Sequence, residues 1–174
     1  MAGAILLDYA AAADFTVTNL HSLASSQSFI AGWNSASVDN STNEYEDYLI
    51  GGTFTTHASN RQAGTIIVGV IGALKDTPVW PTVASGTVGT EGALAFTAVE
   101  QMQAAVRAVA RIPVNNTASQ VYAFPMTGIA QLFGGICPSH WALFVTGNAS
   151  TTTTAQLASS GSALYYKPVA RRYT

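Results

Sequence analysis

The alternation of apolar and polar positions predicts a chain built almost entirely of β-strands. The clearest such stretch, YEDYLIGGTFTT at residues 45–56, sets aromatic and branched side chains among polar ones, as half-buried strands do. Inside it, Gly51 and Gly52 predict a bulge or bend in the strand. A near-continuous apolar run at residues 65–74 predicts a central strand that is buried on both faces. WALFVT at residues 141–146 predicts a second short buried strand.

Shorter apolar stretches between turn residues predict the remaining strands, at residues 28–33, 121–124 and 162–169. Pro168 lacks the N–H that a ladder needs, so it favours an edge position or the end of the last strand.

One segment fits two structures. Residues 104–114 follow the period of a strand, whereas the composition of residues 98–104 also suits a helix, which leaves those residues open between the two. Residues 129–133 predict one short helical turn, which Gly134 and Gly135 would end.

These elements predict an all-β fold, an antiparallel β-sandwich with at most one or two short helical turns. Jelly-roll connectivity is one way to join the strands. The 174 residues are enough for one domain with a substantial core, which we assign to residues 28–174. Residues 1–27 are Ala-rich and weakly patterned, and we expect an extended N-terminal arm or a first strand there. A partner or a neighbouring subunit would order such an arm.

The densest run of charge lies just before the 45–56 strand. DNSTN at residues 39–43 has the short polar side chains of a turn. The acidic residues of this region are Asp39, Glu44, Glu46 and Asp47. Because side chains alternate along a strand, Glu44 and Glu46 are predicted to share one face and Asp47 the other, as on an exposed edge.

Charged residues make up only 9% of the chain, against roughly 25% in a typical soluble domain. Free monomers usually rely on charge for solubility, so this deficit favours a protein that hides surface in an assembly. A very stable β-protein with a neutral surface is the alternative.

The net charge of −2 argues against general binding to nucleic acid or to anionic membranes. No run reaches the ~18 apolar residues of a membrane span, and MAGAILLDYA lacks the pattern of a secretory signal. With a single cysteine as well, we expect a chain made in a reducing cytoplasm.

The charge is unevenly distributed along the chain. Residues 1–100 hold nine acids and two bases, a net charge of −7, whereas residues 101–174 hold five bases and no acid. The two parts can pair within one chain, or the acidic turn of one subunit can meet the basic C-terminus of its neighbour. The second hypothesis gives the candidate subunit or capsid contacts: Asp39, Glu44, Glu46, Asp47, Lys167, Arg171 and Arg172.

No combination of residues indicates catalysis, a cofactor or a metal, and we expect none of the three. The histidines are scattered, and no G-x-S-x-G elbow is present. Cys137 and His140 could form a nucleophile and base, but a third orienting group is missing, and a small buried thiol is the simpler interpretation. The oxygens of Asp39, Asn40, Asn43 and Glu44 could hold calcium, although no EF-hand pattern is present.

Several motifs occur in the same order as in a known class of proteins. They are W-x-S-x-x-V-D-N-S-T-N-x-Y-x-D-Y-L-I at residues 33–50, L-x-D-T-P-x-W-P at 74–81, L-F-G-G-x-x-P at 132–138, F-V-T at 144–146 and A-L-Y-Y-x-P-V at 163–169. Together they resemble small virion structural proteins of tailed bacteriophages, across roughly residues 30–170. Because these motifs are structural, they carry fold more securely than role.

The resemblance implies a capsid decoration, or cement, protein. Such a protein is made in the bacterial cytoplasm and sits on the outer surface of the virion. It is commonly a homotrimer, and it clamps neighbouring subunits of the major capsid protein. A tail, neck or fibre-associated virion component is one alternative. Another is a carbohydrate-binding β-sandwich module, which would need exposed aromatic residues such as Trp33, Trp80, Tyr45 and Tyr48.

Overall fold

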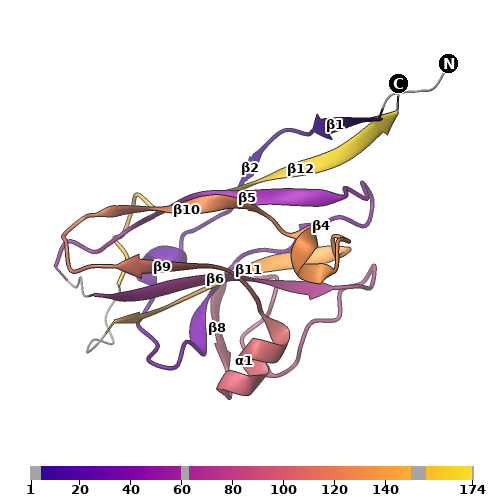
Figure 1. Ribbon diagram of the computed structural model, residues 1–174. Coiled ribbons are helices and arrows are strands. Elements are labelled where there is room, and N and C mark those ends of the chain that lie inside the picture. The colour runs from indigo at the N-terminus through magenta and orange to yellow at the C-terminus, as the bar shows by residue number, and fades with distance from the viewer. Residues whose placement is uncertain (1–4, 60–62, 150–155, 174) are drawn as a thin grey trace.

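The computed structural model describes residues 5–59, 63–149 and 156–173 and shows two antiparallel β-sheets packed against each other (Figure 1). The predicted all-β sandwich is therefore confirmed. The first sheet contains, in spatial order, β1 (Ile5–Tyr9), β12 (Ala163–Tyr173), β5 (Asp47–Thr55) and β10 (Val121–Gly128), with β2 (Ala13–Asp14) also paired to β12. The second sheet contains, in spatial order, β7 (Ala84–Ser85), β8 (Gly92–Phe96), β3 (Ala31–Asn34), β11 (His140–Ala149), β6 (Gly64–Ala73) and β9 (Arg107–Val114), with β4 (Val38–Asp39) also paired to β11.

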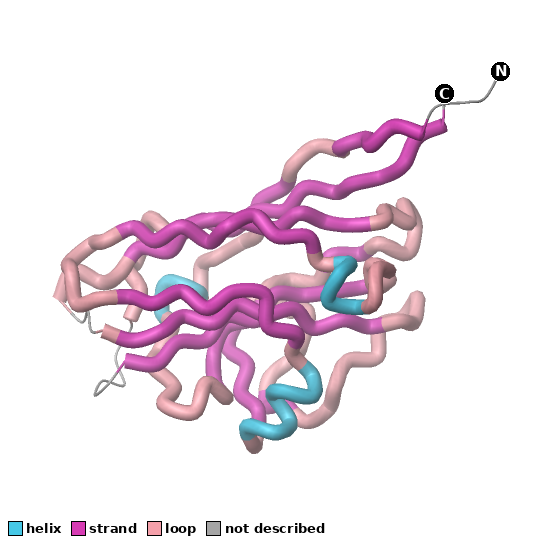
Figure 2. The backbone as a smooth tube through the Cα atoms, in the orientation of Figure 1, coloured by secondary structure: helices cyan, strands magenta, loops and turns pink. Residues whose placement is uncertain are grey.

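Helical structure in the described residues is confined to three short segments, drawn in cyan in Figure 2. They are the 3-10 helices η1 (Leu20–Ser22) and η2 (Ala130–Phe133) and the α-helix α1 (Val99–Ala105). The predicted turn before Gly134 is confirmed as η2, and Gly134 ends it in the left-handed conformation with φ of 79°. The segment that the sequence left open is α1, and β9 follows it as predicted.

Strands β6 and β11 form the centre of the second sheet. They pair from His140 and Ala73 to Ala149 and Gly64. One of their faces meets the first sheet through an aromatic cluster of Phe15, Tyr48, Trp141 and Tyr166, whose ring centroids lie 4.9 to 5.8 Å apart. The opposite face is covered by α1 and by the loop before β8, with Ile71, Leu94, Phe96 and Phe144 buried between them. The two strands are therefore buried on both faces, as their apolar runs predict.

The predicted bulge at Gly51 and Gly52 is wrong in its position. Strand β5 runs through both glycines, and the extra residue lies in β10, where Phe124 pairs with Gly52 but Thr127 pairs with Ile50. The glycines are required for close packing instead. A Cβ at Gly52 would collide with the carbonyl oxygen of Ala163 in the neighbouring strand.

The predicted edge position of Pro168 is also wrong, because β12 lies between β5 on one side and β1 with β2 on the other. Residues 10–12 interrupt the ladder beside Pro168, whose carbonyl oxygen accepts a hydrogen bond from the Ala10 amide at 3.1 Å. The N–H and C=O of one residue point to the same neighbour in an antiparallel ladder, so the missing donor faces this interruption. An interior proline is tolerated there.

The N-terminal segment divides into two parts. Strand β2 and the buried side chains of Phe15, Leu20 and Leu23 belong to the packing of the sandwich. Strand β1 pairs only with β12, at residues 169–173, and with them extends beyond the rest of the molecule at the upper right of Figure 1. We call this two-stranded element, residues 5–9 and 169–173, the ribbon.

Candidate functional site

A buried asparagine shapes the acidic turn, which we call the elbow and define as residues 39–47. The Asn40 side chain donates to the Tyr45 carbonyl oxygen at 2.9 Å and accepts from the Tyr45 amide at 2.8 Å and from the Tyr48 hydroxyl at 3.0 Å. Its backbone amide donates to the Ser139 carbonyl oxygen at 2.7 Å. Asn40 therefore holds the elbow against both β5 and the segment that leads into β11.

The predicted placement of Glu44 and Glu46 on one strand face is wrong. Strand β5 begins at Asp47, and Glu44 lies in the turn with a left-handed φ of 49°. The Glu44 amide donates to the Asn40 carbonyl oxygen at 3.0 Å, which closes the turn. A short polar turn can bend in this way where a strand cannot, so Glu44 lies outside the β5 ladder.

Asp39 and Asp47 hold the local backbone in place. Asp39 Oδ1 accepts from the hydroxyl and the amide of Ser41 at 2.7 and 2.8 Å, and these hydrogen bonds lower its pKa. His140 Nε2 lies 3.3 Å from the same oxygen. Asp47 Oδ1 accepts from the Ala130 amide at 2.7 Å and so joins the start of β5 to η2.

The candidate contacts at the chain's basic end have different surroundings. Arg171 Nε lies 2.9 Å from Glu46 Oε2, so the pairing of acidic and basic parts within one chain describes these two residues. Lys167 Nζ lies 5.7 Å from the centre of the Tyr9 ring. Within the described ranges, neither Arg172 nor Glu44 makes an ion pair. Contact of any of the seven with another subunit stays a prediction.

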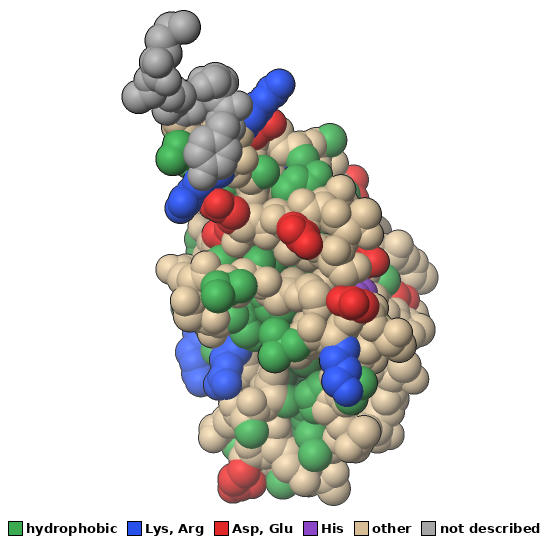
Figure 3. All heavy atoms as spheres, turned by 90° about the vertical axis from the view of Figure 1, so that its right-hand side faces the viewer, with side chains coloured by type: hydrophobic (Ala, Val, Ile, Leu, Met, Phe, Trp, Pro, Cys, Tyr) green, Lys and Arg blue, Asp and Glu red, His purple; other side chains and the backbone are tan. Residues whose placement is uncertain are grey.

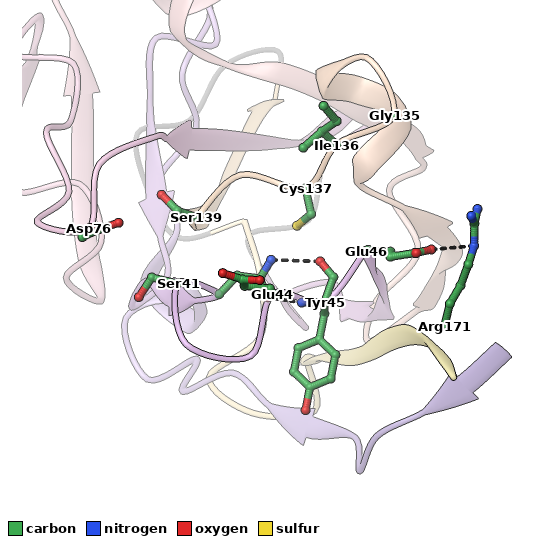
Figure 4. A pocket seen from close by; sticks show the side chains of 11 residues that line it. Ser41, Glu44, Tyr45, Glu46, Asp76, Gly135, Ile136, Cys137, Ser139 and Arg171 are labelled. Atoms are coloured by element: carbon green, nitrogen blue, oxygen red, sulfur yellow. Dashed lines mark hydrogen bonds and ion pairs between the residues drawn. The ribbon is translucent and has the colours of Figure 1, made fainter. Parts of the chain in front are cut away.

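Three hollows meet at the loop of residues 134–138, at one end of the sandwich. The first, of about 500 Å³, separates the elbow from Ile136 and Cys137, and Figure 4 shows Glu44 and Tyr45 across from them. The second, of about 350 Å³, lies at the base of the ribbon beside Leu7 and Tyr9. The third, of about 690 Å³, is the most apolar, and we call it the apolar groove: Leu74, Arg107, Leu132, Phe133, Ile136 and Pro138 line it.

Cys137 lies on the wall between the first hollow and the apolar groove, and it is buried. Burial raises the pKa of the thiol to about 12, with a smaller contribution from the negative charge of Asp47. The side chain is therefore a protonated thiol at neutral pH, which is a poor nucleophile. The interpretation as a small buried thiol fits this environment.

Several residues considered for calcium or for carbohydrate are engaged in the fold. Within residues 5–59, 63–149 and 156–173, no group of three or more His, Cys, Asp or Glu side chains could hold a metal ion. The Asn40 oxygen considered for calcium is bound by Tyr45 and Tyr48 instead. Of the aromatic residues considered for carbohydrate, Trp33 and Tyr48 are buried in the core.

Two features of the structure were not predicted from the sequence. Glu91 accepts hydrogen bonds from Trp33 Nε1 at 2.7 Å and from the Asn19 amide at 2.8 Å. Burial alone would raise the pKa of Glu91, but the hydrogen bonds from Trp33 and Asn19 outweigh it and lower the pKa. Nothing in the local sequence marks this acid. The second feature is the apolar character of β1 on both faces, which ILLDY does signal, since its apolar residues do not alternate with polar ones.

Comparisons with known proteins add no relative. No protein-family model, curated protein or solved structure matches this chain. In the part of the chain that the structure describes, no helix is long and apolar enough to cross a membrane.

Proposed function

We propose that this chain is a non-enzymatic structural protein of a tailed-bacteriophage particle. As a homo-oligomer on the outer surface of the icosahedral capsid, it clamps neighbouring subunits of the major capsid protein. The observation that carries the proposal is the ribbon. It projects from a well-packed sandwich and exposes more than half of each of Ile5, Leu6, Leu7 and Tyr9.

An isolated two-stranded ribbon is marginally stable in water, and large contiguous apolar surfaces on soluble proteins mark binding sites. The rest of the molecule does not need the ribbon for its core, because the aromatic cluster and the centre of the second sheet lie within the sandwich. The ribbon is therefore best explained as an element that another protein surface covers.

The polar residues of the elbow support a structural role. Asp39 and Asp47 bind backbone amides, Asn40 closes the turn, and Cys137 is a buried protonated thiol. The side chains of Asp39, Asn40 and Asp47 thus hold the fold through hydrogen bonds. The low charge and the ordered phage-like motifs also favour a protein that buries surface against other subunits. Many interfaces of ordinary size, repeated over a shell, add up to a strong clamp.

The test is to locate and count the protein in phage particles purified from the source of this gene. We expect quantitative mass spectrometry to find a copy number comparable with that of the major capsid protein. Antibodies against the purified chain should label the whole shell in electron micrographs. Label confined to one vertex, with a far smaller copy number, would assign the chain to the tail or neck. Particles without the chain would refute the proposal.

A further inference from the structure

The ribbon carries apolar side chains on both of its faces. Because side chains alternate along a strand, Ile5, Leu7 and Tyr9 share one face, and Leu6 and Asp8 share the other. The first face turns toward the body, where Leu7 and Tyr9 line the hollow at the base of the ribbon. The second face carries Leu6 beside its cross-strand partner Arg172, with Asp8 two residues further along β1. Leu6 remains 52% exposed.

The apolar groove is the other unoccupied apolar surface at this end. Two side chains on its lining are almost fully in solvent: Leu74 is 88% exposed and Ile136 is 76% exposed. Figure 3 shows a band of hydrophobic side chains down the middle of this end of the molecule, with basic side chains on either side of it. A groove of this volume and polarity can accept one or two aliphatic side chains.

The charges around the two surfaces are complementary. The second face of the ribbon presents Leu6 between an acid, Asp8, and a base, Arg172. The groove has a base, Arg107, in its lining, and the adjoining hollow has the acids Glu44 and Asp76 in its own. Among the described residues none of these five charged side chains forms an ion pair. Each is therefore available to a partner.

We propose that the ribbon of one copy of this chain docks onto a second copy. Leu6 enters the apolar groove, Asp8 meets Arg107, and Arg172 faces Glu44 and Asp76. The ribbon is held in the first sheet by the continuous strand β12 and projects away from the body, so it does not reach its own groove. Ribbon and groove lie at the same end of the molecule. Two copies can therefore exchange ribbons reciprocally, or a closed ring can pass them from one subunit to the next.

This inference rests on the homo-oligomer that the proposed function includes, but it does not depend on a viral setting. Sedimentation of the purified chain tests self-association without any particle, whereas labelling of phage particles tests the location. Each can therefore fail while the other succeeds.

The first experiment is sedimentation velocity of the full chain over a range of concentrations. We expect reversible oligomers, and we expect Leu6→Glu and Leu74→Glu each to raise the dissociation constant about tenfold or more, because each places a charge in an apolar contact. Val121→Glu is the matched control, since Val121 is 53% exposed and pairs with Thr55, at the end of β5 that lies away from the elbow. A wild-type chain that stays monomeric at every concentration would overturn the proposal, as would equal effects of all three substitutions.

A charge exchange tests the register of the contact. Asp8→Arg and Arg107→Asp should each weaken the oligomer, and the chain that carries both should recover most of the wild-type affinity. The three variants are compared only if their far-ultraviolet circular dichroism spectra match that of the wild type. Failure of the double variant to recover would show that Asp8 and Arg107 do not meet.

A cross-link distinguishes docking in the groove from pairing of two β1 edges, the other way in which copies could join. In a Cys137→Ala background, chains with Leu6→Cys and differently tagged chains with Leu74→Cys are mixed and oxidised. We expect a disulfide between Cys at position 6 of one chain and Cys at position 74 of a chain that carries the other tag. If this disulfide does not form, and two copies that each carry Leu7→Cys cross-link to one another instead, the copies pair through their β1 edges. That result would refute the groove as the docking site.

Discussion

The two halves of strand β12 belong to one continuous strand but differ in their neighbours and in their burial. Residues 163–168 lie between β2 and β5, with Leu164 buried and Tyr166 against the aromatic cluster. Residues 170–173 pair with β1 alone and carry the exposed Arg171 and Arg172. The inner half is thus paired on both edges, whereas the outer half is paired on one. A strand becomes core when a second layer covers it, and the outer half of β12 has no such layer within its own chain.

The largest effect on stability should come from removing a side chain that covers residues 163–168 of β12. Trp141 is fully buried and contacts Phe15, Tyr48 and Tyr166. We expect Trp141→Ala to lower the free energy of unfolding by about 3–5 kcal/mol, because it leaves a large cavity in the cluster. Chemical denaturation followed by circular dichroism measures the change. Leu7→Ala, in the ribbon, serves as the comparison and should change the value for the monomer by less than about 0.5 kcal/mol. Equal losses would contradict the distinction between the two halves.

The second-largest loss of stability should follow a change in the elbow. We expect Asn40→Ala to destabilise the fold by about 2–3 kcal/mol, because it removes three hydrogen bonds and leaves the buried Tyr48 hydroxyl without its acceptor. Asn43→Ala is the control, since Asn43 is exposed in the same turn. The urea midpoints of the two variants give the comparison. If both changes cost the same, Asn40 would not organise the elbow.

Glu91 should make stability depend on pH. Its pKa is lower in the folded chain than in the unfolded chain. The stability it contributes is therefore complete above its unfolded pKa of about 4.3 and is lost as the pH falls below that value. We expect Glu91→Gln to cost about 1–2 kcal/mol at neutral pH and to flatten the fall in stability between about pH 5 and pH 3. Thermal unfolding across this range checks the prediction. If the stability of the variant falls between about pH 5 and pH 3 as much as that of the wild type, Glu91 is not the cause of this pH dependence.

The smallest effects concern the two neighbouring arginines. Arg171→Glu should lower monomer stability by at most about 1 kcal/mol, since its ion pair with Glu46 is solvent-exposed and screened by salt. Arg172→Glu should leave the monomer unchanged and weaken self-association in a salt-dependent manner. Unfolding and sedimentation of both variants, at low and high salt, separate the two roles. The same outcome for both residues would contradict their assignment.

The fold was predictable where a pattern belongs to one segment alone. The buried strands β6 and β11 follow from the apolar runs at residues 65–74 and 141–146, although Leu74 lies just beyond β6 and is exposed, and η2 follows from a short helical stretch before two glycines. The predictions fail where the structure of a segment depends on the strand that pairs with it. The bulge lies in β10 because of how that strand pairs with β5, and Pro168 is interior because the ladder beside it is interrupted.

The candidate site was predictable only in part, for the same reason. The sequence identified the elbow as a charged turn, but the carboxylates of Asp47 and Glu46 are engaged by Ala130 and Arg171, which lie far away in the chain. Glu91 escaped notice because Asn19 and Trp33, its partners, are also distant in sequence. The ribbon could have been anticipated from ILLDY, since a strand that is apolar on both faces needs cover on both.

Hydrogen–deuterium exchange at low and high protein concentration tests most directly whether the outer half of β12 is an interface. We predict that amides of residues 163–167 exchange slowly at both concentrations. Protection of residues 5–9, 170–173 and 132–138 should rise together as the concentration rises, because each copy then covers the ribbon and groove of another. Exchange in those three segments that does not depend on concentration would contradict the account.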